Sequence, residues 1–283
     1  MVPPDDAILR ETRWASWIVV AVLVPALVVL WGFPGNTEDL WAWTIKPDLT
    51  QIFMGAGYGA GAYFFARTAL GQRWHAVSAG VLSAAFFAAV MLIVTVIHWD
   101  RFNHGDAPFW AAFTFYAWVV IYIAAPFVVG GLWLRNQPTD PRRPRPDDPL
   151  LPRAVRRVAQ AFSAALGVTA LVLLLRPSLA VDHGPWALTP LTARVVGAFT
   201  AQVAFGVWLI SREERWSSWR VLLQTFLVAT VLLFAGVARA RGDLETDRAS
   251  AWIFLAGLAG LAVAILVLYR TMERRPTTPA PSS

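Results

Sequence analysis

Residues 76–98 read AVSAGVLSAAFFAAVMLIVTVIH, a stretch that contains no Asp, Glu, Lys or Arg. The hydrocarbon core of a bilayer is about 30 Å thick, and about 20 helical residues span it. Backbone polar groups in lipid must be satisfied within the segment, so a stretch of this kind forms a helix. Similar stretches recur along the whole chain. Together they cover 13–32, 50–70, 76–98, 109–134, 154–175, 187–210, 216–238 and 251–269.

The eight stretches predict an all-α integral membrane protein with eight transmembrane helices. Hydrophobic residues make up 57% of the chain and charged residues 15%, against about 45–50% and about 25% in soluble domains. The formal charge of +6 comes from basic residues between the apolar stretches, which is typical of membrane proteins and does not indicate nucleic-acid binding. The sequence has no cysteine, which excludes disulfides, thiolate catalysis and thiolate metal sites.

The distribution of basic residues predicts the orientation of the chain. With the N-terminus inside, the inner segments hold 17 Lys and Arg residues and the outer loops hold six. Because cytoplasmic loops are enriched in positive charge, we expect both termini in the cytoplasm. Lys46 is the single lysine beside 23 arginines, a composition typical of GC-rich bacterial genomes. The expected location is therefore a bacterial plasma membrane.

A charged segment divides the chain into two halves. Residues 135–153 read RNQPTDPRRPRPDDPLLPR and contain six prolines, which a helix interior does not tolerate. The sequence thus predicts a four-helix unit over 1–134, a cytoplasmic linker over 135–153, and a second four-helix unit with a short cytoplasmic tail over 154–283. The linker is either a solvated spacer or a Pro-rich docking segment for a cytoplasmic partner.

The two halves align with each other. The offset is 143 positions in the first block of matches and 142 positions further along the chain. The coinciding residues are Pro34 with Pro177, Asp39 with Asp182, Trp43 with Trp186 and Pro47 with Pro190, and, after the change of offset, Arg73-Trp74 with Arg215-Trp216 and Trp110 with Trp252. Four spans are an even number, so both copies insert the same way up. The sequence therefore predicts two parallel repeats, related by a pseudo-two-fold axis along the membrane normal.

Polar residues outside the apolar stretches supply the first candidate site. All 18 carboxylates lie in loops or tails, whereas ion-coupled transporters and proton pumps usually hold an acid within the membrane. The densest polar cluster follows the third stretch and contains His98, Asp100, Arg101, His104 and Asp106. Two imidazoles and two carboxylates at this spacing could bind a divalent metal, but the spacing matches no zinc signature, and we predict no metal site. The open alternatives are a local ion pair between Asp100 and Arg101, or a small-ligand site.

Arg194 lies one turn inside a predicted span and is the second candidate. An arginine at a helix centre costs about 2.5–3.5 kcal/mol, but near the helix start its side chain reaches the surface. Thr189 and Pro190 fit an N-cap and a first helical position. Arg194 either pairs with an outer carboxylate, with Asp182 as the first choice, or forms an anion site at this helix start. Gln51 is its repeat partner and joins the candidate ligand-binding residues.

Two short segments resemble a known group of proteins. His98-Trp99-Asp100-Arg101-Phe102 and Pro190-Leu191-Thr192-Ala193-Arg194 are similar to segments of uncharacterised multi-pass membrane proteins of actinobacteria. The resemblance is confined to these two segments. It implies an actinobacterial host and draws attention to the two segments, but it implies no activity.

Three hypotheses for the function follow. The favoured one is binding or passage of a small, possibly anionic, solute at an outward-facing polar site between the repeats. The second is a non-catalytic accessory or assembly subunit of a membrane complex. The third is a membrane enzyme that acts on a lipid-borne substrate, and the sequence favours it least. We expect no cofactor, and as partners the lipid bilayer with a small solute or another membrane protein.

Overall fold

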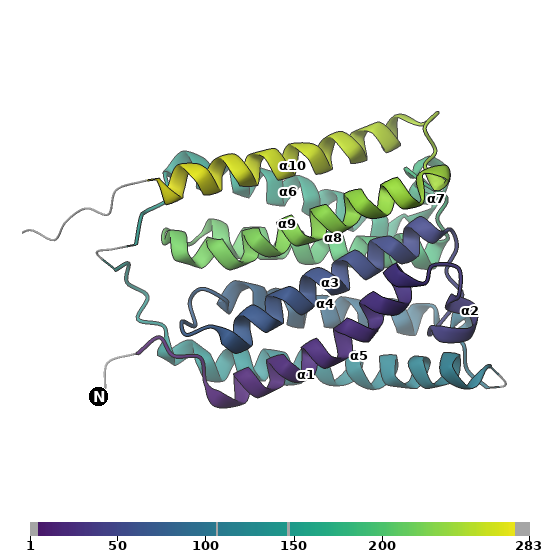
Figure 1. The fold of residues 1–283 in the computed structure, drawn as a ribbon, viewed down its shortest axis with the longest axis horizontal. Helices are drawn as coiled ribbons and strands as arrows, with labels where there is room; N and C mark the ends of the chain where they lie inside the picture. The colour runs from purple at the N-terminus through teal and green to yellow at the C-terminus, as the bar shows by residue number, and fades with distance from the viewer. Residues whose placement is uncertain (1–4, 106, 146–147, 275–283) are drawn as a thin grey trace, which may run out of the picture.

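Residues 5–105, 107–145 and 148–274 are described by a computed structural model, and within these ranges the protein is all-α. Eight long helices run side by side along the long axis of the molecule (Figure 1). They are α1 (Arg10–Leu27), α3 (Asp48–Leu70), α4 (Ser78–Ile97), α5 (Phe109–Asn136), α6 (Arg153–Leu175), α8 (Pro190–Ser211), α9 (Trp216–Arg239) and α10 (Ala249–Glu273).

Seven of these helices are long and apolar enough to cross a membrane, and α3 is the exception. Helix α3 contains Asp48, Gln51, Arg67 and four glycines, which lower its hydropathy. It is nevertheless among the most deeply buried helices, and 15 of its 23 residues are buried. The face of a helix that contacts lipid must be apolar, whereas a helix enclosed by other helices can carry polar residues directed into the bundle. The low hydropathy of α3 therefore follows from its place inside the bundle.

Local sequence explains several helix ends and bends. Pro25 lies inside α1, and the π-helical turn Val28–Gly32 continues this helix. A proline removes one backbone hydrogen bond, so such irregular turns often follow it. The predicted start of α8 is confirmed, since Thr189 forms a capping box with Thr192 and Pro190 is the first helical residue. In the first half, Pro47 lies just before α3 instead of within it.

Helices α3, α4, α8 and α9 form the centre of the bundle. Within the halves, α1 packs on α3 and α4 on α5, just as α6 packs on α8 and α9 on α10. Between the halves, α3 packs on α9 and α4 on α8. Glycine allows one close approach, because an ideal Cβ on Gly55 would lie 2.9 Å from the backbone nitrogen of Trp31. The glycine spacing in α3 thus serves helix packing.

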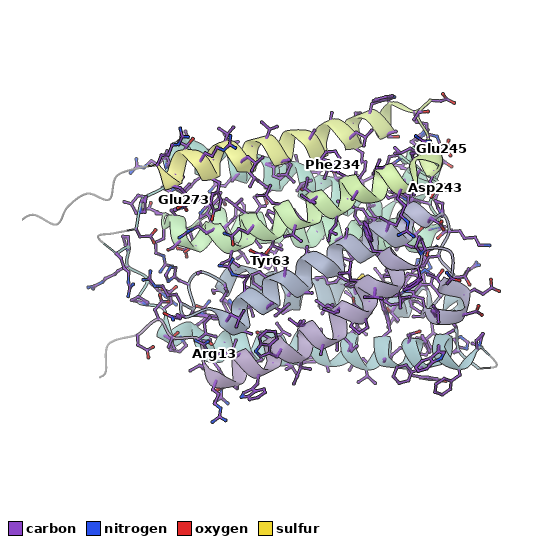
Figure 2. The ribbon with its side chains drawn as sticks, in the orientation of Figure 1. Arg13, Tyr63, Phe234, Asp243, Glu245 and Glu273 are labelled. Carbon is purple, nitrogen blue, oxygen red and sulfur yellow. The ribbon has the colours of Figure 1, made fainter. Side chains whose placement is uncertain are left out.

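The two ends of the bundle hold different segments. Helix α1 starts and α10 finishes at the same end (Figure 1), which we call the termini-bearing end. The short helices α2 (Thr37–Leu40) and α7 (Pro177–His183) lie at the opposite end. In Figure 2, Glu273 marks the termini-bearing end and Asp243 the opposite end, while Phe234 lies between them. Charged groups thus gather at the two ends of the bundle.

Tryptophan placement departs from a simple interfacial belt. Trp14, Trp110 and Trp252 are about 60% exposed, as expected for side chains at a membrane interface. Trp74 and Trp216, which also lie near predicted span ends, are 0% and 3% exposed. Their indole nitrogens donate hydrogen bonds to Gln137 and Glu273. These two side chains therefore anchor the protein interior at the termini-bearing end.

Candidate functional site

Arg194 and His98, predicted from separate segments, contact each other at the opposite end. Nη1 of Arg194 lies 2.9 Å from Nε2 of His98, and Nε donates to the backbone oxygen of Leu174 at 3.0 Å. Burial first, and then the nearby charge of Arg194, lowers the pKa of His98. The imidazole is therefore neutral at pH 7 and accepts the hydrogen bond. The contact joins α8 of the second half to the end of α4 in the first.

The expected ion pair of Arg194 is not formed. No carboxylate in the described part of the chain lies within 4.0 Å of its guanidinium, and Asp182, the first choice, is exposed and makes no ion pair there. Gln51 is fully buried and saturated by local bonds: its amide donates to the oxygens of Ile45 and Asp48, and it accepts from the backbone of Gly35. Gln51 therefore holds the loop before α3.

The remaining cluster residues stay near the surface. Asp100 pairs with Arg101 at 3.4 Å, and both side chains are more than 70% exposed, so this pair contributes little to stability. His104 stacks on Trp99 with ring centroids 6.3 Å apart. Asp106 lies outside the described residues. Among those described, no group of three or more His, Cys, Asp or Glu side chains could hold a metal ion.

The termini-bearing end holds a polar site that sequence reasoning missed. Two extended segments, one before α1 and one before α6, lie along the turns that precede α4 and α9. Ala7 forms a β-bridge with Arg73, and Leu150 forms one with Arg215. The backbone nitrogen of Trp74 donates to the first segment at 2.8 Å, and that of Trp216 donates to the second at 3.0 Å. Each half thus repeats the same local arrangement.

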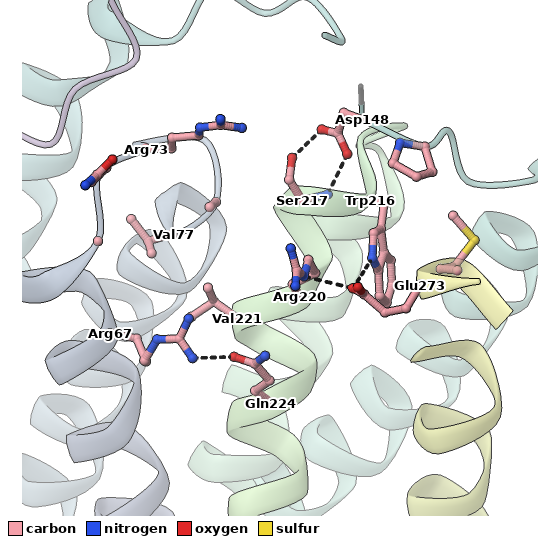
Figure 3. Close-up of a pocket in the computed structure, with 15 residues that line it drawn as sticks. Arg67, Arg73, Val77, Asp148, Trp216, Ser217, Arg220, Val221, Gln224 and Glu273 are labelled. Carbon is pink, nitrogen blue, oxygen red and sulfur yellow. Dashed lines mark hydrogen bonds and ion pairs between the residues drawn. The ribbon is translucent and has the colours of Figure 1, made fainter. Parts of the chain in front are cut away.

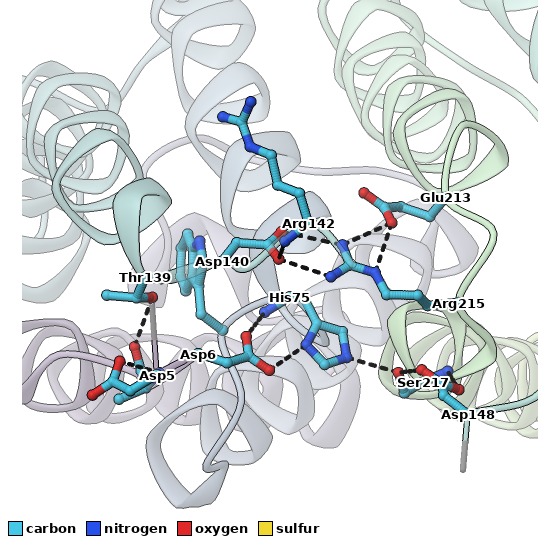
Figure 4. A network of polar contacts seen from close by, with 12 residues as sticks. Asp5, Asp6, His75, Thr139, Asp140, Arg142, Asp148, Glu213, Arg215 and Ser217 are labelled. Atoms are coloured by element: carbon cyan, nitrogen blue, oxygen red, sulfur yellow. Dashed lines mark hydrogen bonds and ion pairs between the residues drawn. The ribbon is translucent and has the colours of Figure 1, made fainter. Parts of the chain in front are cut away.

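Four side chains form a hydrogen-bonded chain between these two arrangements (Figure 4). Asp6 Oδ2 lies 2.5 Å from His75 Nδ1, and His75 Nε2 lies 2.7 Å from Ser217 Oγ. Ser217 Oγ also bonds to Asp148, whose other oxygen accepts from the backbone nitrogen of Ser217 at 3.0 Å. Asp6 and His75 are buried. His75 belongs to the first half and Ser217 to the second, so this chain joins the halves.

Beside this chain, the linker is fixed to the bundle by an ion pair. Arg215 binds both oxygens of Asp140, at 2.7 and 3.1 Å, and also Glu213 at 2.8 Å. Burial acts to raise the pKa of Asp140, but hydrogen bonds from Arg215 and from the backbone of Arg142 outweigh it, and the pKa is lowered. Bidentate pairing of this kind is among the stronger polar contacts in proteins. This part of the predicted linker is therefore docked on the protein.

A cavity of about 560 Å³ opens at the same end, between α3 and α9 (Figure 3). Arg67 reaches across it from α3, and Nη1 donates to Gln224 on α9 at 2.7 Å. The cavity lies between the two halves and extends along α9 from Ser217 to Gln224. Its polar and charged lining residues are Arg67, Gln72, Arg73, Asp148, Ser217, Arg220, Gln224 and Glu273.

The free charge in this cavity is positive. Three guanidinium groups face two carboxylates, and both carboxylates are already engaged. Glu273 accepts from Arg220 at 3.0 Å and from the indole of Trp216 at 2.9 Å. Asp148 is bound by Ser217. Arg67 bonds only to neutral oxygens, and the side chain of Arg73 has no hydrogen bond or ion pair with any described residue.

The sequence contained a signal for this site. At the offset that aligns Arg73 with Arg215, His75 coincides with Ser217. The repeat alignment pairs the turn before α4 with the turn before α9, but it does not predict that His75 and Ser217 in these turns contact each other. The cavity itself depends on the packing of α3 against α9, which no local pattern encodes.

The arrangement defines a multi-pass α-helical membrane protein with a polar cavity between its halves. Comparisons of the chain with protein-family models, with curated proteins and with solved structures find no match.

Proposed function

We propose that the protein binds a small anionic group in the cavity between α3 and α9. This keeps the class of function expected from the sequence and moves its site from Arg194 to the termini-bearing end. The observation that carries the proposal is the pair Arg67 and Arg73, two cations in one cavity that lack a carboxylate partner among the described residues. Guanidinium groups bind carboxylate and phosphate oxygens in bidentate geometry.

The opposite end supports an anion site less well. There, Arg194 already donates to His98 and to Leu174. The two cavities described, the polar one and an apolar groove beside α1 and α5, do not include Arg194 in their linings. We therefore interpret the Arg194–His98 contact as a structural tie between α4 and α8.

The packing pattern supports a two-fold relation between the halves. The two main pairs of packed helices in the first half have counterparts in the second, and the contacts α3–α9 and α4–α8 are counterparts of each other. On this basis we propose two parallel four-helix repeats with α3 as the eighth span. The distribution of basic residues supports a cytoplasmic location for the termini-bearing end, and with it for the anion site, in a bacterial cell.

Titration with inorganic phosphate and with citrate tests the proposal. The purified protein in nanodiscs of neutral lipid should bind one of these anions with saturation. The variant Arg73→Gln should weaken binding about tenfold or more, because a charge-assisted hydrogen bond contributes about 1.5–3 kcal/mol. Arg270→Gln is the matched control, since this exposed arginine on α10 lies outside the cavity lining, and it should leave the affinity unchanged.

A second arm separates a soluble anion from a lipid head group. Nanodiscs with phosphatidylglycerol should compete with free phosphate if an acidic lipid is the physiological ligand, and should leave phosphate binding unchanged if a soluble anion is. Equal affinity of the wild type and the Arg73→Gln variant would overturn the assignment of this cavity, as would the absence of saturable binding of either anion or acidic lipid.

A further inference from the structure

Ser217, His75 and Asp6 lie in the order nucleophile, base and orienting acid. Oγ of Ser217 lies 2.7 Å from Nε2 of His75, and Nδ1 of His75 lies 2.5 Å from Asp6. The same carboxylate accepts from the backbone nitrogen of His75 at 3.1 Å, so Asp6 holds both the backbone and the ring of this residue. Asp6 and His75 are buried, whereas Ser217 lines the cavity. A serine hydroxyl with an oriented histidine behind it is the arrangement that activates serine nucleophiles on unrelated folds.

Structural roles explain only part of this geometry. Asp148 bonds to the backbone nitrogen of Ser217 in the first turn of α9 and thus caps that helix. In the first half, Asp6 likewise accepts a hydrogen bond from the backbone nitrogen of His75. Capping does not require that Nε2 of His75 point across the boundary between the halves at the hydroxyl of Ser217. That contact places a base beside the one hydroxyl among the described residues that line the cationic cavity.

The hydroxyl of Ser217 donates to Asp148 in this geometry. Rotation about its Cβ–Oγ bond turns the same proton toward Nε2 of His75, which lies 2.7 Å from Oγ. At this distance the imidazole is within reach of the proton that a general base accepts.

We propose that Ser217 is a nucleophile that attacks carboxylic esters of anionic molecules, with His75 as general base and Asp6 as the positioning residue. The proposal rests on the anion site above, because Arg67 and Arg73 would hold the negative group of the substrate. Arg220 lies three positions after Ser217, on the same face of α9 and in the same cavity. Its guanidinium supplies positive charge for the oxyanion that forms on attack.

The reaction balances with water as the co-reactant. Oγ forms a bond to the acyl carbon, and its proton passes to Nε2 of His75. The ester C–O bond then breaks, and the leaving alcohol takes that proton. In the second step of the reaction, His75 accepts a proton from water and the resulting hydroxide attacks the acyl-serine. The ester bond to Oγ breaks, and the proton returns from His75 to Oγ. The products are a carboxylic acid and an alcohol, one of which carries the anionic group.

A fluorophosphonate probe with a fluorescent reporter tests the nucleophile in the full chain in nanodiscs. The wild type should be labelled, and peptide mass spectrometry should locate the adduct on Ser217. Ser217→Ala should abolish labelling. His75→Gln should slow it about 100-fold or more, the usual effect of losing a general base. Ser218→Ala is the matched control, because Ser218 is the next residue on α9 but buried, and it should be labelled like the wild type.

Phosphate titration keeps the two proposals separable and shows which variants are folded. A wild type that binds phosphate but is not labelled would overturn the nucleophile and leave the anion site standing. A wild type that is labelled but does not bind phosphate would overturn the anion site and leave the nucleophile standing. Labelling that persists in a Ser217→Ala variant of unchanged thermal stability would also overturn the nucleophile.

Discussion

Replacing Gly55 by alanine should force α1 away from α3 and destabilise the bundle. An ideal Cβ at this position would lie 2.8 Å from Cβ of Trp31, 2.9 Å from its backbone nitrogen and 3.3 Å from the backbone carbon of Leu30. Carbon atoms pack best about 3.5–4.0 Å apart. Backbone atoms cannot rotate away as a side-chain tip can, so the helices must separate by several tenths of an ångström.

The magnitude follows from two opposing effects. Overpacking of this kind typically costs about 1–3 kcal/mol, while alanine gains up to about 1 kcal/mol over glycine in helix propensity. The contacts of the added Cβ are with backbone atoms, which places the cost in the upper part of this range, at about 2–3 kcal/mol. The net expectation for Gly55→Ala is therefore a loss of about 1–2 kcal/mol. Gly257→Ala on α10 is the control, because a Cβ there meets nothing within 4 Å. That variant should be unchanged or slightly more stable.

Thermal unfolding in detergent, followed by intrinsic tryptophan fluorescence, measures both variants without any label. A loss of about 1–2 kcal/mol corresponds to a midpoint lower by several degrees for a chain of this size. Equal unfolding temperatures for Gly55→Ala and Gly257→Ala would show that α3 does not contact the end of α1 closely, contrary to the packing described above.

Three further predictions concern the two ends of the bundle. Burial first, and then the charge of Arg194, lowers the pKa of His98. Acidification below about pH 6.5 should therefore destabilise the wild type, because the unfolded chain binds a proton that the folded one does not. In thermal unfolding between pH 7 and pH 5, the variant His98→Gln should lose this pH dependence. Asp140 has a lowered pKa, so its contribution is complete above about pH 4 and lost below it; Asp140→Asn should lower the unfolding midpoint at pH 7 but not at pH 2.5. The chain has no cysteine, so Arg142→Cys should be shielded from an impermeant maleimide in intact cells while His104→Cys reacts, and the reverse pattern would invert the orientation.

The helices could be predicted from the sequence because bilayer thickness and backbone hydrogen bonding fix their length. With the π-helical turn counted as part of α1, each apolar stretch corresponds to a helix whose ends lie within about four residues of the expected ones. The prediction is weakest for α3, whose polar residues and glycines make it look like a poor span. Its burial among other helices compensates for that composition, and burial depends on tertiary packing.

The contacts between the candidate residues could not be predicted from the sequence. His98 is a candidate because it belongs to the densest polar cluster of the sequence, and Arg194 because an arginine inside a span is costly. The structure brings the two side chains together. The sequence offers Asp182 as the first-choice ion-pair partner of Arg194, yet the structure pairs Arg194 with the neutral imidazole of His98. Helix packing, and not sequence distance, decides which groups meet. His75 and Ser217 belong to turns in different halves of the chain, and their contact requires both halves to be folded.

The most direct test of the anion site is its location in crystals grown with selenate, whose anomalous scattering marks the bound ion. If this cavity binds anions, an anomalous peak should appear between α3 and α9, within hydrogen-bonding distance of the guanidinium of Arg67 or Arg73. A peak at Arg194 with none in this cavity, under conditions in which solution binding is saturated, would contradict this assignment.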